Sequence, residues 1–498
     1  MKKRTADLLA GGLAVLAILA AAGIALFVYR QTPHIEDEFA YLWQAKTMAQ
    51  GKLSLPSPVE PKSQLVPFVI DYEGQRFGKY PPGWPALLSL GARLGLAGWV
   101  NPLLTGVAIW LMYRLGSRVK NERLGLLASL LLLSSPMFLL LAGSLMAHLW
   151  SLVLVLVFCL AWFGLFLDGG FSEAGSVHTM QIAAAGCCLG LLAVTRPLTA
   201  VGVALPFFIH GLTLLIRGSR TERQAVLLIG LQAAIFCLIL PLWQAALTGD
   251  PRQNLYTLWW PYDRYGFGAG VGVTESGHSL RLAWMNIRIS LKSGAKDLFG
   301  WFSFSWILMP FGLLAYRRNR KQWLLLGSTA NLILVYGGYW VGSWLYGPRY
   351  YFEGIPAACI LTAAGVEWLA GWGIQAQGKW QPARRWLAAG LLAVLTGINV
   401  FGYLPARLLE AGSINGMSAD NGWLLEELDS DPALVFIETR DSWWEYGLYV
   451  PLAPPFSKRP LQAALDRGMA ANQLVIEGYP GWRVYHVDLS STLLPGVP

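Results

Sequence analysis

Three consecutive carboxylates, Glu36, Asp37 and Glu38, follow directly on the first long apolar segment of the chain. A carboxylate is costly to remove from water without a partner, so a cluster where an apolar helix meets water suggests a functional site. A positioned carboxylate can take a proton from a reacting group. The same placement also fits a simple helix start, because acidic side chains stabilise the first turn through the helix dipole. Both interpretations stay open on this segment alone.

The segment that begins with these carboxylates is expected to be a helix over residues 36–50. Asp37 and Tyr41 share one face of it, and the helix could lie along the membrane interface with its acidic start beside the bundle. Further on, Lys79 and Tyr80 lie in the sequence GKYPPGWP. The prolines and glycines restrict the backbone there, so both side chains would be held in defined positions.

Ionisable residues inside or beside other apolar segments form a second group of candidates. Arg349 and Tyr350 follow a Gly-Pro pair, where they would either bind a phosphate or anchor the chain at the interface. Glu353 lies inside an apolar segment and needs a partner, for which we expect Arg349, four residues earlier on the same helix face. Arg196 and His148 lie near the ends of two further segments, where a structural role competes with substrate contact.

The segment WWPYDRYGFG, at residues 259–268, is unusually rich in aromatic residues and glycine. Aromatic faces stack on sugars and glycines permit a mobile loop, so this segment could contact a substrate. A belt of aromatic residues at the membrane interface is the alternative. Asp263 and His278 belong to the same loop, and the sequence places neither at a reaction centre.

The composition places the chain among membrane proteins. Of its 498 residues, 55% are hydrophobic and only 13% are charged, and the mean hydropathy is +0.45. The net charge of +9 comes from basic residues clustered in short loops, which indicates membrane topology and not a nucleic-acid-binding surface. All 5 cysteines fall inside apolar segments, so we predict neither a disulfide framework nor a zinc site.

Eleven apolar segments are candidate membrane spans. They lie near residues 8–28, 84–112, 124–141, 145–167, 181–198, 200–216, 225–247, 298–315, 323–341, 350–370 and 387–404. We expect the first to be an uncleaved transmembrane helix and not a signal peptide. Four of the five loops that would face inward carry Lys or Arg residues. This pattern predicts a multi-pass protein of the plasma membrane with a cytoplasmic N-terminus and an extracytoplasmic C-terminus.

Three long segments would then face outward. The first outer loop, 30–83, and the second, 248–297, belong to the transmembrane region 1–404, and residues 405–498 follow it. In this last segment a helix is expected near 460–470. The expected strands lie at residues 434–438, 473–476 and 483–488. Residues 405–498 are therefore predicted to form a small extracytoplasmic α/β cap.

Taken in order, several of these motifs resemble the integral-membrane C-superfamily glycosyltransferases. The sequence DEFAY at 37–41, followed by a helix and by KYPP at 79–82, resembles the first outer loop of these enzymes. The segments GPRYYFE at 347–353 and TRP at 195–197 are similar to the RgtA/B/C/D-like branch of the protein mannosyltransferase and aminoarabinose transferase group. The resemblance covers most of residues 1–404.

The resemblance implies transfer of a sugar, a hexose or a pentose, from a polyprenyl-phosphate carrier to an acceptor at the outer membrane face. Asp37 would be the base that deprotonates the acceptor hydroxyl, with Glu38 in support. The departing lipid phosphate needs cationic or hydrogen-bonding groups. Candidates for these groups are Arg349, Tyr350, Lys79 and Arg264. Candidates for other substrate contacts are Tyr41, Tyr80, His148, Arg196 and Glu353.

The chain departs from the family pattern near the start of the fourth span. Many relatives have a second acidic residue there, whereas the corresponding position in this chain is His148. This departure argues against an acidic metal-binding pair, so we predict no metal site and no required cofactor. A divalent cation bound at Glu38 is the alternative.

We therefore predict an all-α polytopic membrane protein of about 11 transmembrane helices in the C-type glycosyltransferase fold, with the C-terminal α/β domain in addition. Its partners would be a polyprenyl-phosphate-linked sugar, a glycan, lipid or protein acceptor of the cell envelope, and membrane lipid, but no nucleic acid. Two other classes remain, a transporter or flippase for lipid-linked sugars and a non-catalytic envelope assembly protein. Replacing Asp37 by Asn separates them, because only the enzyme needs a carboxylate base.

Overall fold

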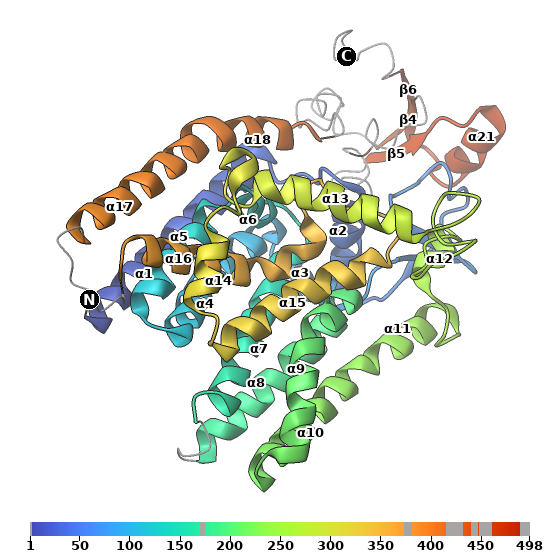
Figure 1. Ribbon diagram of the computed structural model, residues 1–498. Coiled ribbons are helices and arrows are strands. Elements are labelled where there is room, and N and C mark those ends of the chain that lie inside the picture. The colour runs from blue at the N-terminus through green and yellow to red at the C-terminus, as the bar shows by residue number, and fades with distance from the viewer. Residues whose placement is uncertain are drawn as a thin grey trace.

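The computed structural model describes residues 2–169, 175–372, 381–414, 432–439, 447 and 461–488. Apolar helices account for most of these residues and form a bundle that carries loops and short helices at one end (Figure 1). Within the described part of the chain, 6 helices are long and apolar enough to cross a membrane, or up to 9 if each of 3 bent pairs is one span. The number of eleven spans stays a prediction.

The uninterrupted spans are single helices or helices joined end to end. They are α1 (Lys3–Gly23) with a π-helical turn (Ile24–Val28), α7 (His148–Phe166), α9 (Pro197–Arg217), α10 (Arg220–Cys237) with α11 (Ile239–Thr248), the 3-10 helix Arg349–Gly354 with α16 (Ile355–Leu369), and α17 (Gln381–Ile398) with α18 (Leu404–Ala411). The α-helices that belong neither to these spans nor to a bent pair are α2 (Glu36–Ala49), α8 (Gly175–Ala193), α12 (Leu255–Trp259), α15 (Arg320–Gly337) and α21 (Met469–Glu477).

Three helix pairs are sharply bent, and two of them lie where single spans were predicted. The pairs are α3 (Gly83–Arg93) with α4 (Val100–Val119), bent by 118°; α5 (Glu122–Ser134) with α6 (Pro136–Gly143), by 64°; and α13 (Leu280–Asp297) with the segment Phe302–Ala315 that contains α14 (Met309–Ala315), by 106°. In the first pair, Gly95 has a φ of 72°, which a helix cannot continue. In the second, Pro136 excludes Ser135 from helical backbone, and the Ser135 hydroxyl then caps α6. The spans predicted near 84–112 and 124–141 are therefore bent pairs, and that each pair makes a single crossing stays a prediction.

Loops that were predicted to face the same side of the membrane meet in the structure. At one end, Lys321 contacts both Asp168 and the carbonyl of Arg118, and Lys120 Nζ lies 2.7 Å from Glu367 Oε2. The predicted outer loops converge at the other end, where the candidate site lies. These contacts agree with the predicted grouping of the loops at two ends of the bundle. Which end of the bundle faces the cytoplasm stays a prediction.

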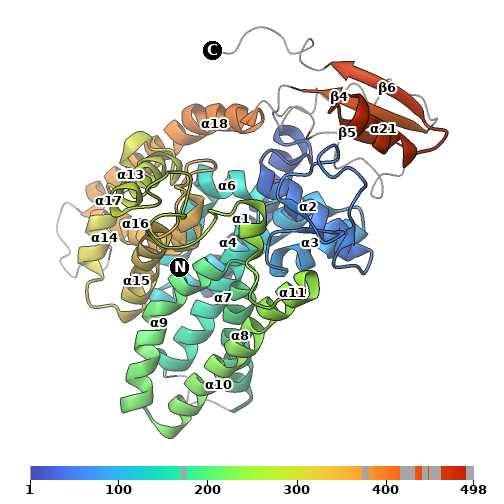
Figure 2. The same cartoon turned by 90° about the vertical axis from the view of Figure 1, so that its right-hand side faces the viewer.

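Two small sheets lie at the outer-loop end. In the first outer loop, β1 (Leu55–Pro56), β3 (Gln75–Gly78) and β2 (Val69–Tyr72) form an antiparallel sheet in that order. In the C-terminal segment, β4 (Ala433–Glu438) lies between β5 (Leu461–Leu465) and β6 (Arg483–Asp488), and all three strands are parallel. The C-terminal sheet lies beside the first outer loop (Figure 2), where the Leu465 amide donates to the Ser63 carbonyl at 2.7 Å.

In the C-terminal segment, one predicted strand is a helix and one predicted helix begins as a strand. Residues 473–476, expected to be a strand, belong to α21, and the expected helix near 460–470 begins as β5. Short apolar runs fit either element, and here Val475 of α21 packs on Leu434 and Phe436 of the central strand. The predicted strands at 434–438 and 483–488 are confirmed. The boundary of a separate cap domain stays a prediction.

Candidate active site

Asp37 brings together three distant segments of the chain. It is the second residue of α2, where the helix dipole favours a negative charge. The Tyr80 hydroxyl donates to Asp37 Oδ1 at 2.5 Å, and Arg349 Nη2 donates to Asp37 Oδ2 at 3.3 Å. The Asp37 side chain keeps 19% of its surface exposed, so a substrate can reach it.

Tyr80 is fixed by the end of the first-loop sheet. Its carbonyl accepts a hydrogen bond from Gln44 Nε2 at 3.1 Å, and its ring lies 4.4 Å from the ring of Tyr41, centroid to centroid. Gly78 permits this approach, because a Cβ there would lie 2.5 Å from Gln44 Oε1. Burial, and next the charge of Asp37, raise the pKa of Tyr80, so its hydroxyl stays protonated and donates.

Glu38, the neighbour of Asp37, is buried and binds backbone amides. One of its oxygens accepts hydrogen bonds from the amides of His34, at 2.8 Å, and Ile35, at 3.3 Å. The other accepts from the amide of Leu145 at 2.7 Å. Burial raises the pKa of Glu38 to about 7, against these hydrogen bonds, which lower it. In this position Glu38 ties the start of α2 to the turn before α7.

Arg349 and Tyr350 enter the site from the 3-10 helix that precedes α16. Arg349 Nη1 is buried and has no hydrogen-bond partner among the described residues, while Nη2 holds Asp37. Tyr350 stacks on Tyr336 of α15, with ring centroids 4.7 Å apart and planes at 9°. The guanidinium therefore keeps a free donor beside the carboxylate.

The expected pairing of Glu353 with Arg349 was wrong. Glu353 pairs with Arg196, the residue that precedes α9. A 3-10 helix has about three residues per turn, so positions i and i+4 do not share a face as they do in an α-helix. Arg196 Nη2 also donates to the hydroxyl of Tyr336, at 3.3 Å, and Tyr336 is the residue on which Tyr350 stacks.

Lys79 lies next to the site in an aromatic enclosure. Its Nζ is 3.4 Å from the ring centroid of Phe68 and 3.5 Å from Asp263 Oδ2. Burial lowers the pKa of Lys79, and Asp263 opposes this shift. Arg264, in contrast, is exposed, and its Nε donates to the Pro261 carbonyl at 3.0 Å within its own loop. The structure thus brings Lys79 to the site and leaves Arg264 outside it.

The sequence alone did not place Asp263 in this region, but the structure does. Besides Lys79, its carboxylate accepts hydrogen bonds from the Tyr339 hydroxyl at 2.8 Å and from Trp340 Nε1 at 3.0 Å. The signal in the sequence was a lone carboxylate among aromatic residues, which needs donors if it is buried. Asp263 fastens the aromatic segment 259–268 to the end of α15.

His148, the first residue of α7, is buried beside the site. Its ring meets Phe352 edge-on, with centroids 6.0 Å apart, and faces the backbone of Arg349. Neither ring nitrogen makes a hydrogen bond of ordinary geometry with the described residues. Across that part of the chain, no three His, Cys, Asp or Glu side chains converge as a metal site requires. Metal independence itself stays a prediction.

Comparison with known proteins finds similarity at the level of structure. No family model matches the sequence, and no curated protein matches it. ArnT from Cupriavidus metallidurans, solved bound to undecaprenyl phosphate, is 14% identical with a TM-score of 0.57, over 96% of this chain and 90% of that one. The apo state of that protein gives 15% identity and the same TM-score, with 96% and 89% covered.

A second solved structure supports the same fold. The archaeal oligosaccharyltransferase AglB from Archaeoglobus fulgidus, in complex with an inhibitory peptide and a dolichol-phosphate, is 14% identical with a TM-score of 0.54. The match covers 91% of this chain but 64% of AglB, so this chain spans less than two thirds of that protein. Both proteins are C-superfamily membrane glycosyltransferases, and this chain has their fold.

Proposed function

We propose that this protein transfers a sugar from a polyprenyl-phosphate carrier to a hydroxyl acceptor of the cell envelope, at the outer membrane face, with Asp37 as the general base. The observation that carries the proposal is the position of Asp37. Its carboxylate is partly open to solvent and is held between Tyr80 and Arg349, where three segments meet.

The arrangement suits a direct displacement. As the acceptor oxygen attacks the anomeric carbon, Asp37 takes its proton and the bond from that carbon to the phosphate oxygen breaks, so the anomeric configuration is inverted. The Tyr80 hydroxyl binds Oδ1 of Asp37 and orients the carboxylate. Oδ2 becomes available to the acceptor hydroxyl when Arg349 leaves it for the donor phosphate.

Arg349 supports this assignment because it has donors for two anions. A guanidinium carries a fork of N–H donors that matches phosphate oxygens, and its buried Nη1 has no partner among the described residues. A phosphate that draws Arg349 away from Asp37 also removes a positive charge from the carboxylate. Asp37 then becomes a stronger base at the moment when the donor is bound.

The structural neighbours support the class of donor. ArnT was solved with undecaprenyl phosphate and AglB with a dolichol-phosphate, and both share the fold of this chain. A long isoprenoid needs a site at the membrane boundary, and the Asp37 site lies where the bundle meets the first outer loop. We propose a glycan, a glycolipid or a protein as the acceptor, and a hexose or pentose as the sugar.

The test incubates the purified protein with a panel of polyprenyl-phosphate sugars and follows release of the sugar from the carrier. Asp37→Asn should lower release by about 100-fold or more, the usual worth of a general base. Asp7→Asn is the matched control, because Asp7 also accepts from a tyrosine, Tyr113 at 2.6 Å, but at the opposite end of the bundle. Full turnover by Asp37→Asn would contradict the base, and absence of binding and turnover with every carrier would contradict the enzyme.

A further inference from the structure

Helix α13 shows an unusual exposed face. Leu280 and Trp284 are 77% and 62% exposed, and basic residues are exposed beside them. The other exposed residues of the helix are Arg281, Met285, Arg288, Ile289, Lys292 and Lys296. Each exposed side chain of α13 is therefore either apolar or basic, and the helix has no exposed carboxylate.

The basic residues form one stripe along the helix. An α-helix advances about 100° per residue, so Arg281, Arg288, Lys292 and Lys296 lie within an arc of about 80°. Trp284 flanks this stripe on one side, and Ile289 flanks it on the other. None of the four cations has an ion pair or a side-chain hydrogen bond within the described part of the chain. Within the described residues, no carboxylate neutralises the charge of this stripe.

The position of α13 fits a helix that lies in the membrane interface. It runs along the outside of the bundle (Figure 1) and is bent by 106° from the apolar segment Phe302–Ala315 that follows it. If that segment enters the bilayer, α13 lies nearly in the plane of the surface. Lys and Arg side chains can then reach the headgroups while the apolar residues beside them enter the acyl region.

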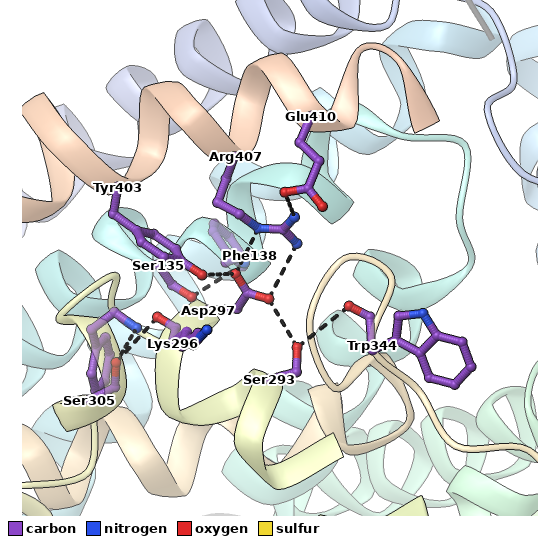
Figure 3. Close-up of polar contacts among 11 residues, drawn as sticks. Ser135, Phe138, Ser293, Lys296, Asp297, Ser305, Trp344, Tyr403, Arg407 and Glu410 are labelled. Atoms are coloured by element: carbon purple, nitrogen blue, oxygen red, sulfur yellow. Dashed lines mark hydrogen bonds and ion pairs between the residues drawn. The ribbon is translucent and has the colours of Figure 1, made fainter. Parts of the chain in front are cut away.

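The opposite face of α13 carries small residues and supports the segment that leads to Arg349. Ser290 Oγ accepts a hydrogen bond from the Ser343 amide at 3.0 Å, and a Cβ on Gly294 would lie 3.0 Å from Pro348 Cγ. At the end of the helix, buried Asp297 binds Ser293 of α13 itself, and it also binds Arg407 of α18 and Tyr403 of the π-helical turn Asn399–Tyr403, which fastens α13 to these two elements (Figure 3). The distances are 2.9 Å from Arg407 Nε, 2.7 Å from the Tyr403 hydroxyl and 3.1 Å from Ser293 Oγ.

We propose that α13 docks on the anionic phospholipid surface of the bilayer that the bundle crosses. The stripe of four cations without a carboxylate supplies the charge complementarity, and the flanking Trp284 and Ile289 supply apolar contact with the lipid. Because the inner face of α13 holds the segment before Arg349, this docking fixes that segment relative to the membrane.

The test places a spin label at Met285→Cys in the full chain, with Cys187, Cys188 and Cys237 replaced by alanine. The protein is reconstituted in nanodiscs of phosphatidylcholine alone or with added phosphatidylglycerol. Accessibility to oxygen, which concentrates in lipid, is compared with accessibility to a water-soluble nickel chelate. We expect phosphatidylglycerol to lower the accessibility to nickel and raise that to oxygen, and high salt to reverse both changes.

Matched charge variants locate the effect. Replacing Arg281, Arg288 and Lys292 by glutamine should abolish the difference between the two lipid compositions, whereas replacing Arg217, Arg220 and Arg223, at the other end of the bundle, should leave it intact. High accessibility to nickel in both compositions for the unaltered stripe would overturn the proposal. So would equal shielding from both probes in both compositions, which would indicate that a second copy or another protein covers α13.

Discussion

Arg349 Nη2 lies 3.3 Å from Asp37 Oδ2, so a single ion pair joins the first outer loop to the segment that starts the α16 span. Both side chains are partly open, with 14% and 19% of their surfaces exposed. Because both side chains stay partly accessible, an incoming anion can exchange for one member of the pair. We propose that this exchange, in which Arg349 leaves Asp37 for the donor phosphate, is the role of the pair.

Arg349→Lys should weaken binding of the lipid-phosphate donor. Lysine keeps the positive charge but loses the planar fork of N–H donors that can bind two phosphate oxygens at once. We expect KM for the donor to rise about tenfold, the cost of one charge-assisted hydrogen bond. A titration of carrier against the initial rate measures this, with Arg252→Lys, an exposed residue of the second outer loop, as control. An unchanged KM would place the phosphate elsewhere.

Tyr80→Phe should reduce the transfer rate while the fold stays intact. The variant keeps the ring that packs on Tyr41 and removes only the 2.5 Å hydrogen bond to Asp37. A hydrogen bond to a charged group is worth about 1.5–3 kcal/mol, so kcat should fall by about 10-fold to 100-fold. Tyr113→Phe removes the equivalent bond to Asp7 at the other end and should leave kcat unchanged. Equal rates for the two variants would exclude an orienting role for Tyr80.

Sequence reasoning could predict the class of the fold and several residues of the candidate site, because these depend on hydropathy and on ordered motifs. Asp37, Tyr80 and Arg349 lie together, although more than 250 residues separate the second from the third. It could not predict the pairing of Glu353, because the local helix type decides which residues share a face. Arg196, which pairs with Glu353, lies at the start of another helix, and the hydrophobic periodicity of a sequence does not predict contacts between helices.

The bent helix pairs and the C-terminal strands and helix show a second limit of prediction from sequence. The chain turns between α5 and α6 at a Ser-Pro pair, yet hydropathy continues through it, so a pattern based on apolar length alone joins the two helices. In the C-terminal segment, the apolar residues of β5 and α21 are few in each element, and tertiary packing on β4 decides the outcome.

The Arg196–Glu353 pair should be sensitive to the loss of one partner. Glu353→Gln leaves a buried guanidinium without its counter-charge, which typically costs about 3–5 kcal/mol. Replacing both residues, as Arg196→Met with Glu353→Gln, should recover part of that loss because no unpaired charge remains. The midpoint of thermal unfolding in detergent measures both effects. Additive losses in the double variant would mean that the two residues act independently.

Glu38 should make stability depend on pH in a defined direction. Burial raises its pKa in the folded protein from 4.5 to about 7, so folding favours its protonated form. That stability is fully present below the unfolded pKa and is lost as pH rises through about 7. Glu38→Gln cannot titrate, so the stability advantage of the unaltered protein over it should shrink by about 3 kcal/mol between about pH 4 and pH 8. Unfolding midpoints across this range test it, with the exposed Glu275→Gln as control; an advantage that grows with pH would contradict it.

Gly347→Ala should disturb Arg349 without removing any of its contacts. Gly347 has a φ of 76°, and a Cβ there would lie 3.1 Å from Asp297 Cβ and 3.1 Å from Met137 Cγ. Gly249 has the same φ of 76° but nothing within 4 Å of its Cβ position, so Gly249→Ala carries the backbone strain alone. Both variants should lose about 1 kcal/mol of stability from the left-handed conformation. Only Gly347→Ala should also shift Arg349, two residues on, and raise KM for the donor. Equal donor kinetics in the two variants would show that the packing of Gly347 on α13 does not position Arg349.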